Sequence, residues 1–220
     1  MLERIPEREI MDSAEEACDY DAMDHSAVNR VFVADFLMAW DGQNPIIDLG
    51  TGTAQIPIEL CRQHPAAEVV AADQSEQMLI IARRNVEKAG FQSRIPLKLH
   101  NVRQLPYANG SFRAVMSNAM IHHVPEPADA IAEMVRIVAL GGLLFVRDLI
   151  RPPDGAALDD IVNTYAADAN LHQRKMFAES LHASLTVDEV RGLVGRFGFA
   201  SRTVRATSDR HWTWCAIKRA

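Results

Sequence analysis

A glycine-rich turn directly after a short apolar run gives the clearest chemical signal in this sequence. The run Ile46–Leu49 leads into Gly50 and Gly52, and an apolar helical pattern follows at residues 56–60. Glycine lets the backbone turn sharply and lets a ligand approach closely, and the start of a helix offers N–H donors without partners. Strand, turn and helix together predict an anion or nucleotide site, with the acid Asp48 beside the turn.

An acid at the end of the next apolar run adds a second part to this site. Asp73 follows the run 69–72 and lies 21 residues after Gly52, where an acid accepts hydrogen bonds from ribose hydroxyls. The fingerprint of NAD sites, G-x-G-x-x-G, requires glycine at position 55, and Gln55 stands there. Because the acid fits more than one nucleoside cofactor, a dinucleotide-dependent oxidoreductase remains an alternative at this point.

A third block of residues weakens that alternative. Its order is similar to a widespread pattern of the class I (Rossmann-like) S-adenosylmethionine-dependent methyltransferases, and the resemblance covers about residues 45–150. The matching positions are Leu105-Pro106-Tyr107, Gly110-Ser111-Phe112, Val115, Ser117, His122-His123-Val124, Arg136-Ile137-Val138 and Gly141-Gly142. The sequence departs from the pattern at Ala54, where the family usually has a third glycine, and at Asn101, Arg113 and Leu140.

The resemblance implies that S-adenosylmethionine is the cofactor and S-adenosylhomocysteine the product. Gly50, Thr51 and Gly52 would wrap the methionine portion, with Asp48 holding the loop near the amino group. Asn118, at the end of the fourth strand, would lie beside the methyl group.

The resemblance also implies a set of residues for the nucleoside end of the cofactor. Asp73 would bind the ribose, and Gln74 and Met78 would flank the ribose and the adenine face. Asn101 and Val102 would contact the adenine edge. Met78 also fits the apolar face of a helix, so packing in the core is an equal alternative for that side chain.

The tandem histidines His122 and His123 are the candidate catalytic residues. A sulfonium is already a good leaving group, so in-line transfer gains mainly from positioning and desolvation. A base is needed only when the acceptor carries a proton that must leave, and an imidazole suits that task near neutral pH. A purely structural role for the pair stays open. No metal-ligand spacing is present, so no metal site is expected.

These residues require a particular set of elements to position them. We expect a Rossmann-like α/β fold with a seven-stranded, mostly parallel sheet, helices on both faces and one antiparallel strand near the edge. The chain is expected to form one methyltransferase domain, 1–220. Its parts are an N-terminal helical or lid segment 1–44, a cofactor-binding core 45–150, and a segment 151–220 with substrate-side helices and the last two strands.

Several local signals place these elements. A helix is predicted at 26–40, and Ser75 and Thr186 are predicted helix caps. The helix after Pro127 is expected to include Val138 and to end at Gly141-Gly142, and residues 156–181 read as largely helical. The acidic stretch 1–24 reads as a solvated surface. Ala54 is expected to lie in a helix with negative φ, so that Ala54→Gly would lower the melting temperature slightly.

Composition limits the functional classes. Hydrophobic residues make up 48% and charged residues 24%, as in soluble globular proteins, and the net charge of −6 disfavours nucleic acid as a partner. Three scattered cysteines, with neither signal peptide nor membrane-spanning run, predict a cytoplasmic protein acting on a small molecule. A non-catalytic, methyltransferase-like protein that binds cofactor or a partner also remains possible.

Overall fold

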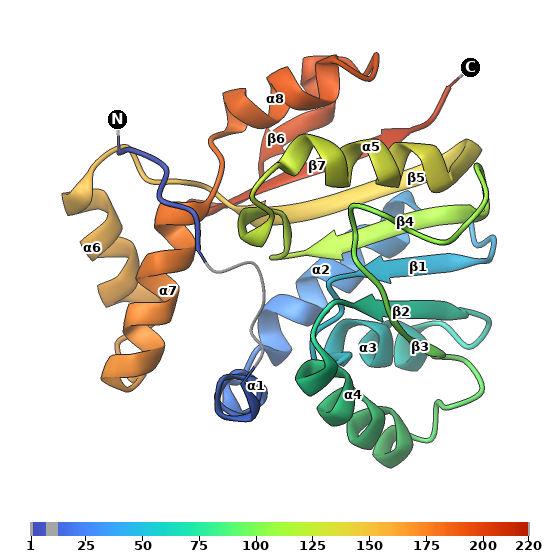
Figure 1. Ribbon diagram of the computed structural model, residues 1–220, viewed down its shortest axis with the longest axis horizontal. Coiled ribbons are helices and arrows are strands. Elements are labelled where there is room, and N and C mark those ends of the chain that lie inside the picture. Colours follow the sequence, from blue (N-terminus) through green and yellow to red (C-terminus); the bar gives the residue numbers. More distant parts are fainter. Residues whose placement is uncertain (1, 8–12, 220) are drawn as a thin grey trace.

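Seven strands form one sheet within the part of the chain that the structure describes, residues 2–7 and 13–219 of a computed structural model (Figure 1). The sheet order is β3-β2-β1-β4-β5-β7-β6. The strands are β1 (Ile46–Leu49), β2 (Val69–Asp73), β3 (Leu97–Leu99), β4 (Phe112–Asn118), β5 (Val138–Leu149), β6 (Val204–Ala206) and β7 (His211–Ile217). Strand β7 is antiparallel to β5 and β6, and β1 to β5 pair in parallel. The predicted sheet is therefore confirmed.

Helices cover both faces of the sheet. On one face, Phe36 of α2 and Leu60 of α3 belong to a buried cluster that also includes Leu79 of α4. On the other face, Ile131 of α5 and Val194 of α8 pack into a second cluster. The helices in the described residues are α1 (Ala14–Ala22), α2 (Ser26–Ala39), α3 (Gln55–Gln63), α4 (Glu76–Ala89), α5 (Pro127–Ile137), α6 (Gly155–Tyr165), α7 (Leu171–Ala183) and α8 (Val187–Gly195), with short 3-10 turns η1 (Ile121–His123) and η2 (Ser201–Thr203). None of them is long and apolar enough to cross a membrane.

Three of these helices lie beyond the carboxyl ends of the strands instead of on a face. Figure 1 shows α1, α6 and α7 on the side toward which the arrows of β1, β2 and β4 point. Residues 2–7 run along the same end, where the Leu2 N–H donates to Pro153 O (2.8 Å) and the Ile5 N–H to His182 O (3.2 Å). The end of the sheet where parallel strands usually bind ligands is thus enclosed by the N-terminal segments and by α6 and α7.

Helix caps agree with the sequence analysis. The Ser75 hydroxyl accepts a hydrogen bond from the Met78 N–H at the start of α4, and Thr186 forms a capping box with Glu189 at the start of α8. The stretch 156–181 is two helices, because Asn170 starts α7 with a capping box of its own. The acidic N-terminal stretch contains α1, which packs against α4 through Ala17.

The boundary between α5 and β5 differs from the prediction. The helix ends at Ile137, and Val138 already pairs with Phe112 in the sheet. Gly141 and Gly142 lie inside the strand, next to a register shift between β5 and β4. A Cβ on Gly142 would approach Arg113 O to 2.8 Å, and Gly141 has φ +75°. These glycines therefore shape an irregular strand; they do not end the helix.

The expectation for Ala54 is wrong. This residue precedes α3 and has a left-handed backbone, φ +62° and ψ 24°. Glycine would relieve a conformational cost of about 1–2 kcal/mol. It would also remove a buried methyl group, at about 0.8 kcal/mol, and add about 0.5–1 kcal/mol of backbone entropy cost. These contributions nearly cancel, so the reason to expect a lower melting temperature for Ala54→Gly is removed.

Candidate functional site

A pocket lies at the carboxyl ends of β1, β2 and β4, between the sheet and α1. Its lining combines backbone of the glycine turn, carboxylate and amide side chains, and several apolar groups. The lining residues are Tyr20, Leu49, Gly50, Gly52, Ala72, Asp73, Gln74, Ser75, Met78, His100, Val102, Asn118, Ala119, Met120, His123 and Val124. Ligands bind at this end of open α/β sheets, where the strand order reverses on either side of β1.

The structure brings eight of the twelve predicted site residues to this pocket. These are Gly50, Gly52, Asp73, Gln74, Met78, Val102, Asn118 and His123. The other four, Asp48, Thr51, Asn101 and His122, lie behind or beside the lining. The roles predicted for all twelve stay predictions, since geometry alone assigns no ligand.

The glycine turn has a backbone that few other residues would tolerate. Gly50 has φ +71°, and a Cβ there would lie 2.3 Å from Met120 Cγ. The turn is fixed to the end of β2, because the N–H groups of Gly50 and Thr51 both donate to Ala72 O, at 2.9 and 3.0 Å. The glycine at position 50 therefore lets the turn lie directly against Met120.

Asp73 joins the glycine turn to the second strand. Its Oδ2 accepts from the Gly52 N–H (2.7 Å), and its Oδ1 accepts from the Ser75 N–H (2.9 Å). Burial raises the pKa of Asp73, although the backbone N–H groups of Ser75, Gly52 and Gln74 favour the ionised form. The carboxylate is thus held at the pocket wall in a fixed orientation, as a hydrogen-bond acceptor for hydroxyl groups must be.

Asp48 lies behind the turn and is almost fully buried. Burial raises its pKa to about 7; the nearby charge of Asp73 adds to this, and the nearby Thr51 hydroxyl opposes it. Asp48 Oδ2 has no hydrogen-bond partner among the described residues. An unsatisfied buried carboxylate oxygen of this kind is suited to a cationic group close to the turn.

At the end of β3 the structure places His100 in the pocket instead of Asn101. Asn101 Oδ1 accepts a hydrogen bond from the Arg103 N–H (2.8 Å), which keeps that side chain in its own turn. The His100 N–H donates to Asp73 O (2.8 Å), and its ring lies edge-on to Tyr107. His100 is therefore the side chain of this turn that lines the pocket, and the adenine contact predicted for Asn101 stays a prediction.

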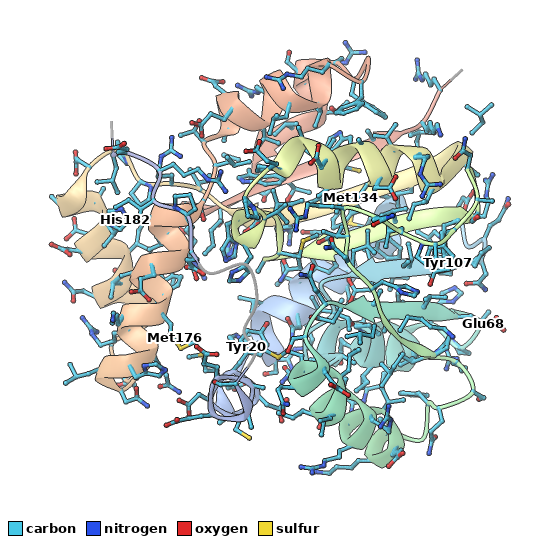
Figure 2. The ribbon with its side chains drawn as sticks, in the orientation of Figure 1. Tyr20, Glu68, Tyr107, Met134, Met176 and His182 are labelled. Carbon is cyan, nitrogen blue, oxygen red and sulfur yellow. The ribbon has the colours of Figure 1, made fainter. Side chains whose placement is uncertain are left out.

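Tyr20 is a pocket residue that the sequence analysis missed. It projects from α1 toward the strand ends (Figure 2), and a Cβ on Gly52 would lie 3.5 Å from its ring. Asp21 anchors this helix by accepting hydrogen bonds from the side chains of Gln55 (3.2 Å) and Asn85 (2.9 Å). Burial raises the pKa of Tyr20 to about 12. Ala17 and Tyr20 are apolar and lie one helical turn apart within an acidic stretch. This spacing was the signal in the sequence that α1 packs against the rest of the protein.

The two predicted catalytic histidines have different environments. His122 is buried, and its Nδ1 lies 2.6 Å from Asp148 Oδ1, while its backbone N–H donates to Asp148 Oδ2 (3.0 Å). Burial opposes protonation of His122, but the charge and hydrogen bond of Asp148 outweigh it, so the pKa of His122 is raised. His123 lines the pocket, and its Nδ1 lies 3.0 Å from Glu7 Oε2. Only His123 of the pair is therefore within reach of a ligand in the pocket.

The sheet order, the reversed β7 and a pocket built on a glycine turn and a strand-end acid define a Rossmann-like, nucleoside-binding α/β protein. Residues 47–146 match the family model described as a methyltransferase domain. This match confirms, for residues 47–146, the resemblance to the class I S-adenosylmethionine-dependent methyltransferases that the sequence predicted.

Individual relatives agree with this assignment. The chain is 38% identical over 111 residues to a demethylmenaquinone methyltransferase of Thermus thermophilus, covering 50% of each chain. It is 29% identical over 144 residues to a ubiquinone/menaquinone biosynthesis C-methyltransferase UbiE of Dinoroseobacter shibae, covering 63% of this chain and 57% of that one. The matches therefore span about half the length of these curated relatives.

Solved structures show that the fold extends over the whole chain. An S-adenosylmethionine-dependent methyltransferase structure from Methanococcus maripaludis has a TM-score of 0.72 at 18% identity, covering 98% of both chains. The plantazolicin methyltransferase BpumL, solved with S-adenosylhomocysteine, has a TM-score of 0.67 at 12% identity, covering 94% of this chain and 92% of that one. At these identities the likeness concerns the fold alone.

The pKa of Asp48 leads to a testable pH dependence. Below pH 7 the free protein holds Asp48 protonated, and a cationic amino group placed at the turn would favour its carboxylate. Binding would then release a proton, so affinity for S-adenosylhomocysteine should rise by about tenfold from pH 6 to pH 8. Titration calorimetry in buffers of different ionisation enthalpy measures both the affinity and the proton released.

Asp48→Asn supplies the control for this prediction, because it keeps the shape of the side chain and cannot titrate. Its affinity for S-adenosylhomocysteine should change much less over the same pH range. An unchanged slope in Asp48→Asn would assign the pH dependence to another group.

Proposed function

We propose that this protein transfers a methyl group from S-adenosylmethionine to a small-molecule acceptor. The convergence of the glycine turn, Asp73 and the apolar side chains of Met78 and Val102 on one pocket carries this proposal. The cofactor, when bound, supplies a methyl group attached to a sulfonium sulfur, and that sulfur leaves readily as a neutral thioether. The protein itself has to bind and orient the two reactants and exclude water, and a recessed pocket at the strand ends favours this.

The lining residues divide the proposed cofactor site into two ends. Gly50 and Gly52 would border the amino-acid end, with Asp48 and Thr51 supporting the turn from behind. Asn118, at the tip of β4, would face the methyl group.

At the nucleoside end, Asp73 would bind the ribose hydroxyls, with Gln74 beside it. Met78 and Val102 would cover the adenine faces. His100 joins Asn101 as a candidate for the adenine edge, because its side chain is the one that lines the pocket.

We further propose a ring carbon of a hydroquinone-type molecule as the acceptor. One relative is named as a demethylmenaquinone methyltransferase and another as a ubiquinone/menaquinone biosynthesis C-methyltransferase, and the second name specifies carbon as the methylated atom. An aromatic acceptor would suit the rest of the pocket lining, since Tyr20, Met120 and Val124 offer apolar surface there. His123 is the proposed catalytic histidine at the acceptor, and His122 is proposed to act through its contact with Asp148.

A methyl-transfer assay with paired acceptors tests this function. The first acceptor is a short-chain 1,4-naphthohydroquinone with a free ring position, and the second carries a methyl group at that position. Carbon transfer predicts a product heavier by one methylene unit, with S-adenosylhomocysteine formed, from the first acceptor only. Mass spectrometry of the products measures this directly.

Transfer to both acceptors would place the methyl group on oxygen and refute the carbon assignment. Binding of S-adenosylhomocysteine without turnover on these or other small acceptors would favour the alternative of a non-catalytic, cofactor-binding protein. Tight binding of NAD with no binding of S-adenosylhomocysteine would refute the whole proposal.

A further inference from the structure

Three metal-ligating side chains meet beside the pocket. They are Glu7, from the N-terminal segment 2–7, and His122 and His123, from the η1 turn after β4. One ligand atom from each lies within 4.8 Å of the other two. Glu7 Oε2 and His123 Nδ1 are already 3.0 Å apart. Around an ion with bonds of about 2.0–2.2 Å, neighbouring ligand atoms lie about 3–3.5 Å apart, so the other two separations would have to close by at most about 1–2 Å.

Asp148 holds His122 in the orientation that a metal ligand requires. It contacts the ring at Nδ1, at 2.6 Å, and accepts the backbone N–H of the same residue. The side chains of both residues are at most 3% exposed. Histidines that bind metals almost always donate their second ring N–H to a carboxylate or carbonyl group. With Nδ1 engaged, Nε2 is the nitrogen of His122 that remains for coordination.

The N-terminal segment fixes Glu7 over the histidines. Arg4 donates through Nε to Ala183 O (2.7 Å) and through Nη2 to Val124 O (3.1 Å), so it ties the segment to α7 and to the end of η1. Glu7 Oε1 is buried and makes no hydrogen bond of normal geometry in the described part of the chain, although the Ser180 side chain lies close to this carboxylate. A buried carboxylate oxygen without a partner is costly unless a cation or a donor satisfies it.

We propose that Glu7, His122 and His123 bind a divalent transition-metal ion of the zinc class. Two imidazoles and one carboxylate suit such ions, and three protein ligands leave a coordination position open. Because His123 also lines the pocket, the open position is adjacent to the space assigned to the acceptor. This site was not expected from the sequence, because Glu7 lies more than 100 positions from the histidines.

A bound ion would have a specific chemical effect on an acceptor in the pocket. A metal lowers the pKa of a hydroxyl group that it binds, and a deprotonated hydroxyl makes the neighbouring ring carbon a better nucleophile. This effect rests on the proposed function, whereas binding of the ion does not.

Metal titrations of chelator-treated protein test the site. Zn²⁺ added in a calorimeter should bind with one equivalent per chain, and Co²⁺ should give the visible absorption bands of a site with nitrogen ligands. Glu7→Gln and His123→Gln should each weaken Zn²⁺ binding by about a hundredfold, and Asp148→Asn by about 10- to 100-fold. Circular dichroism and thermal melting establish that each variant is folded.

His172→Gln is the matched control. His172 lies 3.8 Å from the acid Asp19 and belongs to no group of three potential metal ligands among the described residues, so its replacement should leave Zn²⁺ affinity unchanged. Absence of Zn²⁺ binding, or wild-type affinity in folded Glu7→Gln, would show two ordinary acid–histidine pairs and overturn the proposal. Binding of S-adenosylhomocysteine to the metal-free protein, measured in parallel, reports on the proposed cofactor site separately.

Discussion

Asp73→Ala should weaken binding of S-adenosylhomocysteine by about 1–3 kcal/mol, or about 5- to 150-fold, since hydrogen bonds to a charged group are lost. The geometry adds to this loss, because the same carboxylate also accepts the N–H groups of Gly52 and Ser75. Without it, the glycine turn loses a direct contact with β2. Titration calorimetry measures the affinity, and thermal melting measures the stability of the variant.

Two further variants make this prediction specific. Asp73→Asn keeps the shape but replaces one acceptor oxygen by a donor group, so it should lie between Asp73→Ala and wild type. Glu76→Gln removes a nearby acid that does not line the pocket and should leave the affinity within about twofold, as for a screened surface charge. Equal losses in Asp73→Ala and Glu76→Gln would mean that general charge, and no ribose contact, governs binding.

Gly50→Ala should lower the free energy of unfolding by about 2–5 kcal/mol, because two costs combine at this position. A left-handed backbone costs an alanine about 1–2 kcal/mol. The added Cβ would also lie 2.3 Å from Met120 Cγ and 2.6 Å from Met120 Cβ, and overpacking of this kind costs about 1–3 kcal/mol. Urea unfolding measures the loss, and affinity for S-adenosylhomocysteine should fall with it as the turn is displaced.

Gly90→Ala separates the two costs. Gly90 has φ +76°, close to that of Gly50, but nothing lies within 4 Å of a Cβ built there. It should therefore show the backbone cost alone, about 1–2 kcal/mol. Met120→Gly should recover much of the packing cost in the Gly50→Ala background and none in Gly90→Ala. Equal destabilisation by the two alanine variants would contradict the close contact with Met120.

Much of the fold follows from local sequence signals. Buried parallel strands read as continuous apolar runs, and Ile46–Leu49 and Val69–Asp73 each end at a turn or cap that the sequence also marks. The predicted boundary between α5 and β5 is wrong for a physical reason. Val138 fits the helical spacing of Ile131 and Met134, but pairing with Phe112 on β4 draws it into the sheet. Gly141 and Gly142, a residue type normally associated with helix ends, instead lie in β5 next to its register shift with β4.

The candidate site was predictable where it depends on the order of the strands and not where distant segments meet. Asp73 and the glycine turn are fixed by their own strands. Tyr20 and Glu7, by contrast, enter the site because α1 and residues 2–7 fold back over the strand ends, which no local pattern encodes. His100 and Asn101 show a finer limit, since a turn of known position still leaves open which of two adjacent side chains points inward.

The position of β7 has a consequence for how the chain is made. Of the seven described strands, β7 is the last to leave the ribosome, yet it lies inside the sheet between β5 and β6. Until residues 211–217 emerge, the buried, apolar end of β5 has an unpaired edge of the kind that joins edges of other chains. Trp212 and Trp214, which complete one hydrophobic cluster, also arrive last. Translation that stops shortly before Trp212 would leave an open sheet, and such a product should be a substrate for chaperones and proteases instead of a shortened working protein.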